Sequence, residues 1–353
     1  MPSGTVRLRV GGAIYSGWKR VAVSRSLEAG AGAFDLTVSQ LFPTAPGSRP
    51  IHTGQRCEVS IDDDRLIAGY VDQVEVSLSA TDRDVTYRGR DALADLIDSA
   101  PDLRPSEWFN VGLLELAKQL AEPFGVPVRS EVADLGPPFP RVSLNAGQHA
   151  FELIAEHARY RRVLPISDGL GGLVFVRAGT ERARAKIVEG LNLKSGTSSD
   201  DSSGRYSEYI VKGQATNLGN LGKSAGKSAG RAKDSEITRH RPLLIVADQA
   251  ATIELCQQRA EWEALNRSAR ATRATVTVVD WRDATGALWR LNTLVGFESP
   301  SLALSGEFLI SSVVYELSSD GTTTTLTLDR PDAFTVAPEP DPQKSGVLRS
   351  LSQ

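Results

Sequence analysis

The sequence has few of the residues on which catalysis and metal binding usually depend. It contains two cysteines and four histidines among 353 residues. Cys57 and Cys256 lie far apart and lack the spacing of a zinc site, which argues against a disulfide scaffold and suits a reducing compartment. The histidines are scattered along the chain, at His52, His149, His157 and His240.

Long apolar runs and a strong excess of one charge are missing as well. No apolar run approaches the ~18–20 residues of a membrane span, and the first residues lack the apolar stretch of a signal peptide. Lys and Arg number 40 against 43 Asp and Glu, so the net charge of −3 does not favour a strongly basic nucleic-acid binder. The composition, 41% hydrophobic and 24% charged, is globular, and the length suits two to four domains.

Alternating apolar and polar residues near the start of the chain predict β-strands. The alternation is clear over 6–10, 34–38 and 57–61, and period 2 is typical of a strand with one exposed face. Turn residues such as Gly and Asp separate these segments. The pattern predicts an antiparallel β-barrel or sandwich over residues 1–100.

Helical periodicity replaces this alternation in the middle of the chain. The spacing of leucines predicts a helix over 111–124, with Asn110 as its cap. A second helix is predicted over 149–162, followed by a hairpin within 163–176. The sequence therefore predicts a small α+β domain over residues 101–190.

Strand patterns return in the last part of the chain. They predict a second β-barrel over 191–335, interrupted by an inserted helical segment of about 238–272 that contains a long helix. The Gly/Ser-rich stretch 217–235 is typical of a flexible loop. Residues 336–353 are rich in proline and predict a tail.

Two hairpins resemble each other faintly. In both 66–88 and 309–329 an apolar strand leads through a polar turn into a second strand. The similarity indicates two related β units, one near each end of the chain. Unrelated hairpins could also look this similar, so both interpretations remain open.

Two pairs of carboxylates could serve a glycoside hydrolase, which needs an acid and a base or nucleophile. Asp91 with Asp95, and Glu152 with Glu156, are each spaced four residues apart. Helix capping or solvation is the favoured interpretation of the first pair. An exposed, ion-paired helix face that includes Arg159 is favoured for the second.

The histidines and tryptophans give no stronger signal for a site. His149 and His157 are eight residues apart, more than two helical turns, which is too far for easy joint metal binding. Trp262, Trp281 and Trp289 could stack on sugars, but such aromatics are usually core or interface anchors.

Two Gly-Lys-Ser triplets, at 222–224 and 226–228, look like the end of a phosphate-binding loop. Asn217 and Leu221 stand where that loop requires glycine, so nucleotide binding is not favoured. No GxSxG, HExxH or GxGxxG motif is present. We therefore predict no catalytic, cofactor-binding or metal-binding residue. Candidate contacts to an acidic partner or DNA are Lys223, Lys227 and Arg231.

Seven short blocks carry a further signal when they are taken in order. They are Gly17-Trp18 with Val21, Val23 and Phe34; 87–96; 151–154 leading to 173–175; 206–214; 239–245; 259–263; and 286–292. In this order they resemble the central baseplate hub protein of Mu-type contractile-tailed phages, the protein P family. That family is itself similar to the hub part of type VI secretion spike proteins. The resemblance covers roughly residues 10–330, without 217–235 and the tail.

The resemblance implies an α+β, mostly β fold with two similar antiparallel β-barrel units and small α/β units, assembled as a trimeric ring. Six barrels around a pore would join a sixfold tail tube to a threefold spike and leave a lumen for DNA. The implied partners are two further copies, the central spike, a tail tube or distal tube-end protein and baseplate wedge proteins, with the tape-measure protein as a further candidate. The implied location is the virion tail baseplate, after synthesis in the host bacterial cytoplasm and without stable membrane insertion.

Two alternatives to this structural, non-enzymatic role remain open. The first is a tail-associated peptidoglycan hydrolase. The second is a nucleic-acid or nucleotide-binding protein that uses the Lys-rich loop, although the acidic balance and the broken phosphate loop speak against it.

Overall fold

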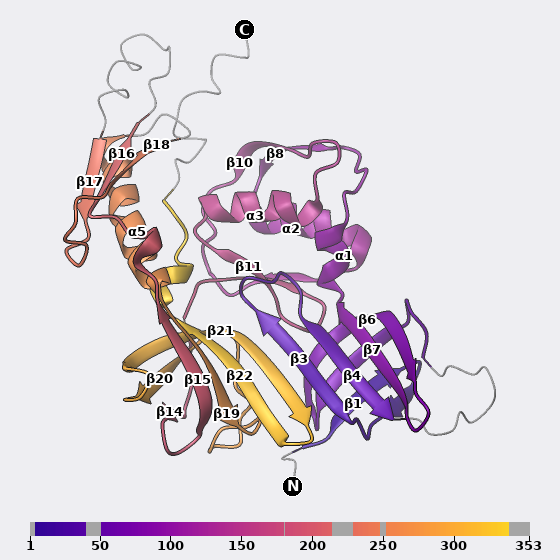
Figure 1. Cartoon of the computed structure of the whole chain (residues 1–353). Coiled ribbons are helices and arrows are strands. Elements are labelled where there is room, and N and C mark those ends of the chain that lie inside the picture. Colours follow the sequence, from indigo (N-terminus) through magenta and orange to yellow (C-terminus); the bar gives the residue numbers. More distant parts are fainter. Residues whose placement is uncertain (1–3, 40–50, 180, 214–228, 248–251, 339–353) are drawn as a thin grey trace.

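Two β units, a middle domain and a small helix–sheet module make up the fold. The computed structural model describes residues 4–39, 51–179, 181–213, 229–247 and 252–338. In Figure 1 the two β units lie side by side, the middle domain lies above the first unit, and the module lies above the second. The α+β, mostly β fold class predicted from the sequence is confirmed.

The first β unit contains seven strands among the described residues. They are β1 (Val6–Val10), β2 (Ala13–Tyr15), β3 (Arg20–Ser26), β4 (Ala33–Ser39), β5 (Arg56–Ile61), β6 (Asp64–Leu78) and β7 (Arg83–Asp91). All three alternating segments of the sequence lie in these strands, β1, β4 and β5, and their apolar residues are the more buried ones except in β4, where Thr37 is buried and Val38 is half-buried. Alternation identifies them because successive side chains of a strand point to opposite faces.

The middle domain follows directly. Its elements are α1 (Leu93–Asp98), β8 (Glu107–Val111), α2 (Leu113–Ala121), the 3-10 turn η1 (Glu122–Phe124), β9 (Val128–Ser130), β10 (Phe139–Ser143), α3 (Ala150–Tyr160), β11 (Leu164–Ser167) and β12 (Leu173–Val176). They enclose their own hydrophobic core. Leu93 and Leu96 of α1 belong to that core, so the domain begins earlier than the predicted boundary at residue 100.

Both predicted helices of the middle domain are present, but the predicted cap of the first is wrong. The N-cap of α2 is Gly112, in extended conformation. Asn110 instead lies in β8 with a φ of 49°. Asparagine tolerates this left-handed conformation better than most residues, which explains its presence at this position.

The second β unit contains a further set of strands. They are β13 (Glu181–Arg182), β14 (Ile187–Val188), β15 (Leu193–Asp200), β19 (Thr272–Val279), β20 (Thr293–Ser299), β21 (Leu304–Ser318) and β22 (Gly321–Asp329), and the 3-10 turn η3 (Pro331–Phe334) follows. Because β13 and β14 pair with β20, this unit begins before the predicted boundary at residue 191.

The inserted module between β15 and β19 differs from the prediction. It contains the 3-10 turn η2 (Ser202–Gly204), β16 (Glu208–Lys212), β17 (Ala229–Lys233), β18 (Pro242–Val246) and α5 (Ile253–Ala271). The segment 238–272 is therefore not only helical, and the end of the predicted loop 217–235 is a strand. Gly230 explains the error, since a Cβ there would lie 2.2 Å from the backbone carbon of Cys256 in α5. The glycine allows close strand–helix packing rather than flexibility.

The two β units have the same strand order. Five strands of the first are arranged β3-β4-β7-β6-β5, and five strands of the second are arranged β15-β19-β22-β21-β20. In chain order both read first, second, fifth, fourth, third, and every neighbouring pair is antiparallel. The two hairpins noted in the sequence are β6–β7 and β21–β22, which occupy the same place in each unit.

The long strands β6 and β21 share a further irregularity. Each has 15 residues and changes register midway along its pairing with the next strand. The shift lies between Val71 and Gln73 in β6 and between Ile310 and Ser312 in β21. Such a bulge bends a strand and increases its twist, so the two halves of each long strand run in different directions.

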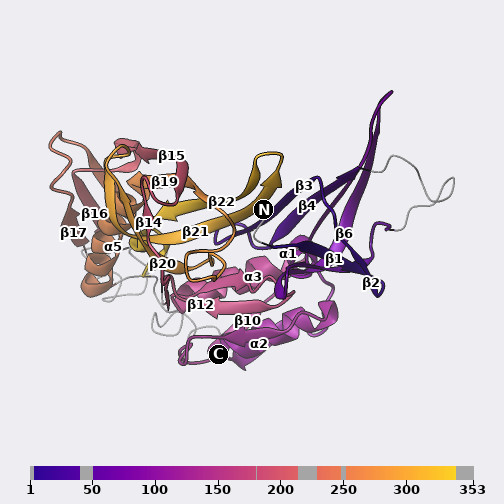
Figure 2. The ribbon, with the colours of Figure 1, turned by 90° about the horizontal axis from the view of Figure 1, so that it is seen from below.

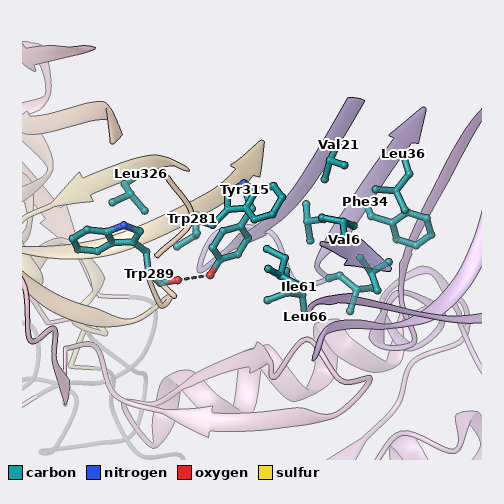
Figure 3. Close-up of a cluster of buried hydrophobic side chains, with 14 of the residues drawn as sticks. Val6, Val21, Phe34, Leu36, Ile61, Leu66, Trp281, Trp289, Tyr315 and Leu326 are labelled. Carbon is teal, nitrogen blue, oxygen red and sulfur yellow. Dashed lines mark hydrogen bonds between the residues drawn. The ribbon is translucent and has the colours of Figure 1, made fainter. Parts of the chain in front are cut away.

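The β units are joined by pairing of β3 with the second half of β21, in which Ser312 lies opposite Ser26 and Leu317 opposite Val21. One hydrophobic core runs across this junction (Figure 3). Tyr315 lies at its centre, and its hydroxyl donates a hydrogen bond to the carbonyl oxygen of Trp289. The two units therefore form one continuous sheet over a shared core.

We expect Trp281→Ala to destabilise this core strongly. The Trp281 side chain is fully buried, and its indole N–H donates a hydrogen bond of 2.8 Å to the carbonyl of Glu316. The loss should be about 3–5 kcal/mol of unfolding free energy, measured by denaturant titration with circular dichroism. The matched control is Trp262→Ala on the half-buried face of α5, which should lose clearly less. Equal losses would contradict this account.

Candidate assembly surfaces

The carboxylate pair Asp91 and Asp95 is separated by burial. Asp91 is 1% exposed and accepts hydrogen bonds from the backbone N–H of Gly32 at 2.6 Å, that of Leu93 at 3.0 Å and the hydroxyl of Ser167 at 2.6 Å. Burial raises the pKa of its carboxyl group, and these hydrogen bonds oppose the shift. Asp95 is exposed to solvent. The Asp91 carboxylate therefore links the residue before β4, the first residue of α1 and the last residue of β11. Its role is structural, and Asp95 lies apart from it on the surface.

The other carboxylate and histidine candidates from the sequence also occupy structural positions. Glu152 and Glu156 lie exposed on α3. Nδ1 of His149 is 2.9 Å from the carbonyl oxygen of Ile97, and Nδ1 of His157 is 2.9 Å from that of Leu153. Burial lowers the pKa of His157. Nδ1 of each histidine thus has a partner within the middle domain.

The three tryptophans have structural positions too. Trp281 and Trp289 are buried in the core of the second β unit. Trp262 is half-buried on α5, and its indole N–H donates to the carbonyl and hydroxyl oxygens of Thr335. The interpretation of Trp281 and Trp289 as core anchors is confirmed.

A metal site is not found in the part of the chain that the structure describes. In this part no three His, Cys, Asp or Glu side chains gather closely enough to hold a metal ion. No described helix is both apolar and long enough to cross a membrane.

The Lys-rich candidate contacts are only partly described. Lys223 and Lys227 lie outside the described residues. Arg231, predicted in the same loop, lies in β17 instead, where its guanidinium is 2.9 Å from the Glu208 carboxylate. Its side chain is still 61% exposed, so it remains accessible from solvent.

A cavity of about 410 Å³ lies where the two β units meet the middle domain. Its lining includes Arg25, Arg129 and Arg290, but also carboxylates such as Asp64 and Asp168. Charges of both signs thus balance each other, and Arg25 already donates a hydrogen bond to the carbonyl of Ser167. The cavity is an interdomain junction rather than a site that selects an anion.

Among the described residues, two open edges of the large sheet lie at β6 and β15. The second half of β6, residues 72–78, pairs with β7 on one side only, and β15 pairs along its length with β19, apart from a single bridge between Leu193 and Glu189. Figure 2 shows the β6–β7 hairpin extending beyond the rest of the first unit, with β15 on the opposite side of the molecule. Open edges present unpaired backbone N–H and C=O groups, which can bind another strand.

Sequence reasoning missed these edges, although a signal was present. Val74, Val76 and Leu78 recur at every second position, as Val313, Tyr315 and Leu317 do. Comparing the two long strands residue by residue would have shown that both carry an apolar stripe in their second half. The structure shows that β3 pairs with the edge of the second half of β21, whereas no described strand pairs with the corresponding edge of β6.

Comparison with known proteins shows where similar chains occur. Residues 5–91 match the N-terminal domain model of Mu phage baseplate assembly protein GpP-like. Residues 93–177 match the second domain of baseplate hub protein gp44-like, and 252–337 match the fourth domain of Mu phage baseplate assembly protein GpP. The first two matches agree with the observed domain limits.

Relatives that match almost the whole chain are also phage or prophage tail proteins. The chain is 34% identical over 348 residues to baseplate hub protein gp44 of Escherichia phage Mu, covering 96% of this chain and 91% of the relative. The 43 kDa tail protein of prophage MuSo2 from Shewanella oneidensis has 34% identity and a TM-score of 0.84, with 94% and 99% of the two chains covered.

A more distant solved structure shares the fold alone. The E. coli c3393 protein, described as a component of the type VI secretion system, has a TM-score of 0.54 at 10% identity, covering 95% of this chain and 80% of that one. The resemblance predicted from the ordered sequence blocks is thus confirmed at the level of family and fold.

We expect Asp91→Ala to lower the free energy of unfolding by about 3 kcal/mol, because it leaves three buried donors without an acceptor. Asp95→Ala, four residues away on the surface, should change it by less than about 0.5 kcal/mol. Urea titrations of both variants measure the difference. A small effect at Asp91 would contradict its structural assignment.

Proposed function

This chain belongs to the family of baseplate hub proteins of Mu-like phage tails, and on that premise we propose that it acts as a symmetry adaptor. Three copies form a ring around a lumen through which DNA passes. One face of the ring binds the sixfold tail tube, and the other binds the threefold spike. As a hub protein the chain is a structural component of the virion tail.

The shared strand order of the two β units carries this proposal. Each copy has two units with the same five-strand arrangement, so three copies present six similar units. Six similar positions can match a sixfold tube while the ring itself has only threefold symmetry. We expect each unit to act as a barrel-like block in this ring, as the resemblance implies.

Further partners follow from the same position in the tail. We propose contacts with the central spike, with a tail tube or distal tube-end protein and with baseplate wedge proteins, with the tape-measure protein as a further candidate. The alternative function, peptidoglycan hydrolysis, has no specific support, because burial separates Asp91 from Asp95 and because Glu152 and Glu156 lie on an exposed helix face.

The assembly state tests the adaptor role. Mass photometry of the purified chain, alone and with its spike, should show a species of three times 37.9 kDa. Closed rings are expected because a head-to-tail contact between copies must either close or grow into a filament. A strict monomer in the presence of both spike and tube proteins would refute the proposal.

Enzymatic activity is tested separately. Purified protein incubated with cell-wall sacculi should release no more soluble fragments than buffer does, with a lysozyme as positive control. Release that disappears in Glu152→Gln, or in an Asp91→Asn variant that circular dichroism shows to be folded, would establish the hydrolase alternative instead.

The Lys-rich segment is proposed to contact an acidic partner. Lys223→Ala with Lys227→Ala should leave stability unchanged but weaken capture of the partner in pull-down experiments. Arg231→Ala removes an exposed ion pair with Glu208 and should cost less than about 1 kcal/mol of stability. Normal capture by the double lysine variant would show that these lysines are not the contact.

A further inference from the structure

We propose that the open edge of β6 pairs with β15 of a second copy, antiparallel, so that the sheet continues from one copy into the next. This inference rests on the ring proposed above and names the strands that close it. The occupant of the β6 edge is thus a defined segment of the same chain rather than another protein.

The junction inside the chain supplies the pattern for this contact. In the second β unit, the first half of β21 pairs with β20 and its second half pairs with β3. In the first β unit, the first half of β6 pairs with β5 in the same way. Residues 72–78, however, have no neighbour on that side among the described residues.

Strand β15 is the counterpart of β3. Each is the outermost strand of its five-strand order, next to β19 in one unit and β4 in the other. Whereas β3 is covered by β21, β15 has a free outer edge in the described structure, and six of its eight residues are exposed. A contact that repeats the β21–β3 pairing therefore brings β6 of one copy onto β15 of the next.

A threonine pair aligns the two units. Thr37 lies opposite Thr86 with their hydroxyl oxygens 3.0 Å apart, and Thr277 lies opposite Thr325 with a distance of 3.3 Å. Thr37 lies opposite Arg20 in β3, and Thr277 lies opposite Ser195 in β15. Arg20 and Ser195 are therefore equivalent positions in the two units.

The same threonine pairs also align the long strands β6 and β21. Thr86 lies opposite Glu75, and Thr325 lies opposite Val314. Within β21–β3, Glu316 lies opposite Ala22 and Leu317 opposite Val21. Transferred to the open edges, these pairs become Ser77 opposite Thr197 and Leu78 opposite Gly196.

The side chains at the transferred positions fit this register. Leu78 is 78% exposed in the single chain, although it continues the apolar stripe of Val74 and Val76. On the Cβ side of Gly196, the apolar side chains of Val276 and Leu302 lie 3.0 and 3.1 Å from the position that a Cβ would take, so Leu78 in the pair would join apolar neighbours. Residues 72–78 also contain no lysine or proline, the residues that commonly protect an open edge.

The positions of the two edges allow a ring to form. Figures 1 and 2 both show β6 and β15 on opposite sides of the molecule. A contact between unlike surfaces of two copies is head-to-tail, and such contacts form closed rings when the rotation between copies permits it.

Disulfide trapping tests the register in the full chain. Ser77→Cys with Thr197→Cys should crosslink copies on mild oxidation, because directly opposite residues bring their Cβ atoms to ~4.5–5.5 Å, close to the ~3.5–4.5 Å of a disulfide. The matched control is Ser77→Cys with Ser199→Cys, on the same face but two residues along, which should crosslink about ten-fold less. The native Cys57 and Cys256 are buried. Reducing and non-reducing gels compare the products, and mass photometry under reducing conditions reports assembly.

A covalent trimer from the first pair and little from the control supports the inference. A second pair, Val76→Cys with Ser198→Cys, repeats the test if the first variant does not assemble. Trimers that form without selective crosslinking would overturn this pairing and leave the adaptor role intact. Monomers without crosslinks, even with spike and tube present, would overturn both.

Discussion

The antiparallel pairing of β3 with the second half of β21 determines how the two β units are placed. Backbone N–H and C=O groups in a sheet need partners, and β21 provides them to β20 over its first half and to β3 over its second. The bulge near Ser312 allows this change of partner without a break in the strand. Tyr315 and the surrounding core then fill the space beneath the junction.

Much of the fold follows from local patterns in the sequence. Alternation identified strands such as Val6–Val10, and leucine spacing identified α2, because each pattern reflects one buried face. The module between β15 and β19 could not be predicted in this way. Gly230 looks like part of a flexible Gly/Ser stretch, and only the tertiary approach of Cys256 shows why a glycine stands there.

The candidate sites, like the fold, could be predicted from the sequence only in part. Residue type and spacing suggested the carboxylate pairs, but whether a carboxylate is buried against donors, as Asp91 is, depends on strands and loops distant in sequence. The open edges are harder still to predict from the sequence. The residue pattern of a strand is local, but whether a neighbouring strand is present depends on the whole sheet. The family resemblance, by contrast, depended on the order of several weak blocks, and that order survives even where each block alone is ambiguous.

The junction also has a consequence for biosynthesis. Arg25 and Ser312 meet across it although 287 residues separate them along the chain. At ~5–20 residues per second, a ribosome needs roughly 15–60 s to make the intervening chain. During this time β3 has emerged without its covering strand, and unpaired edges of nascent chains favour aggregation. The yield of native protein should therefore depend on the speed of translation and on chaperones that shield the early strands, in addition to the stability of the finished fold.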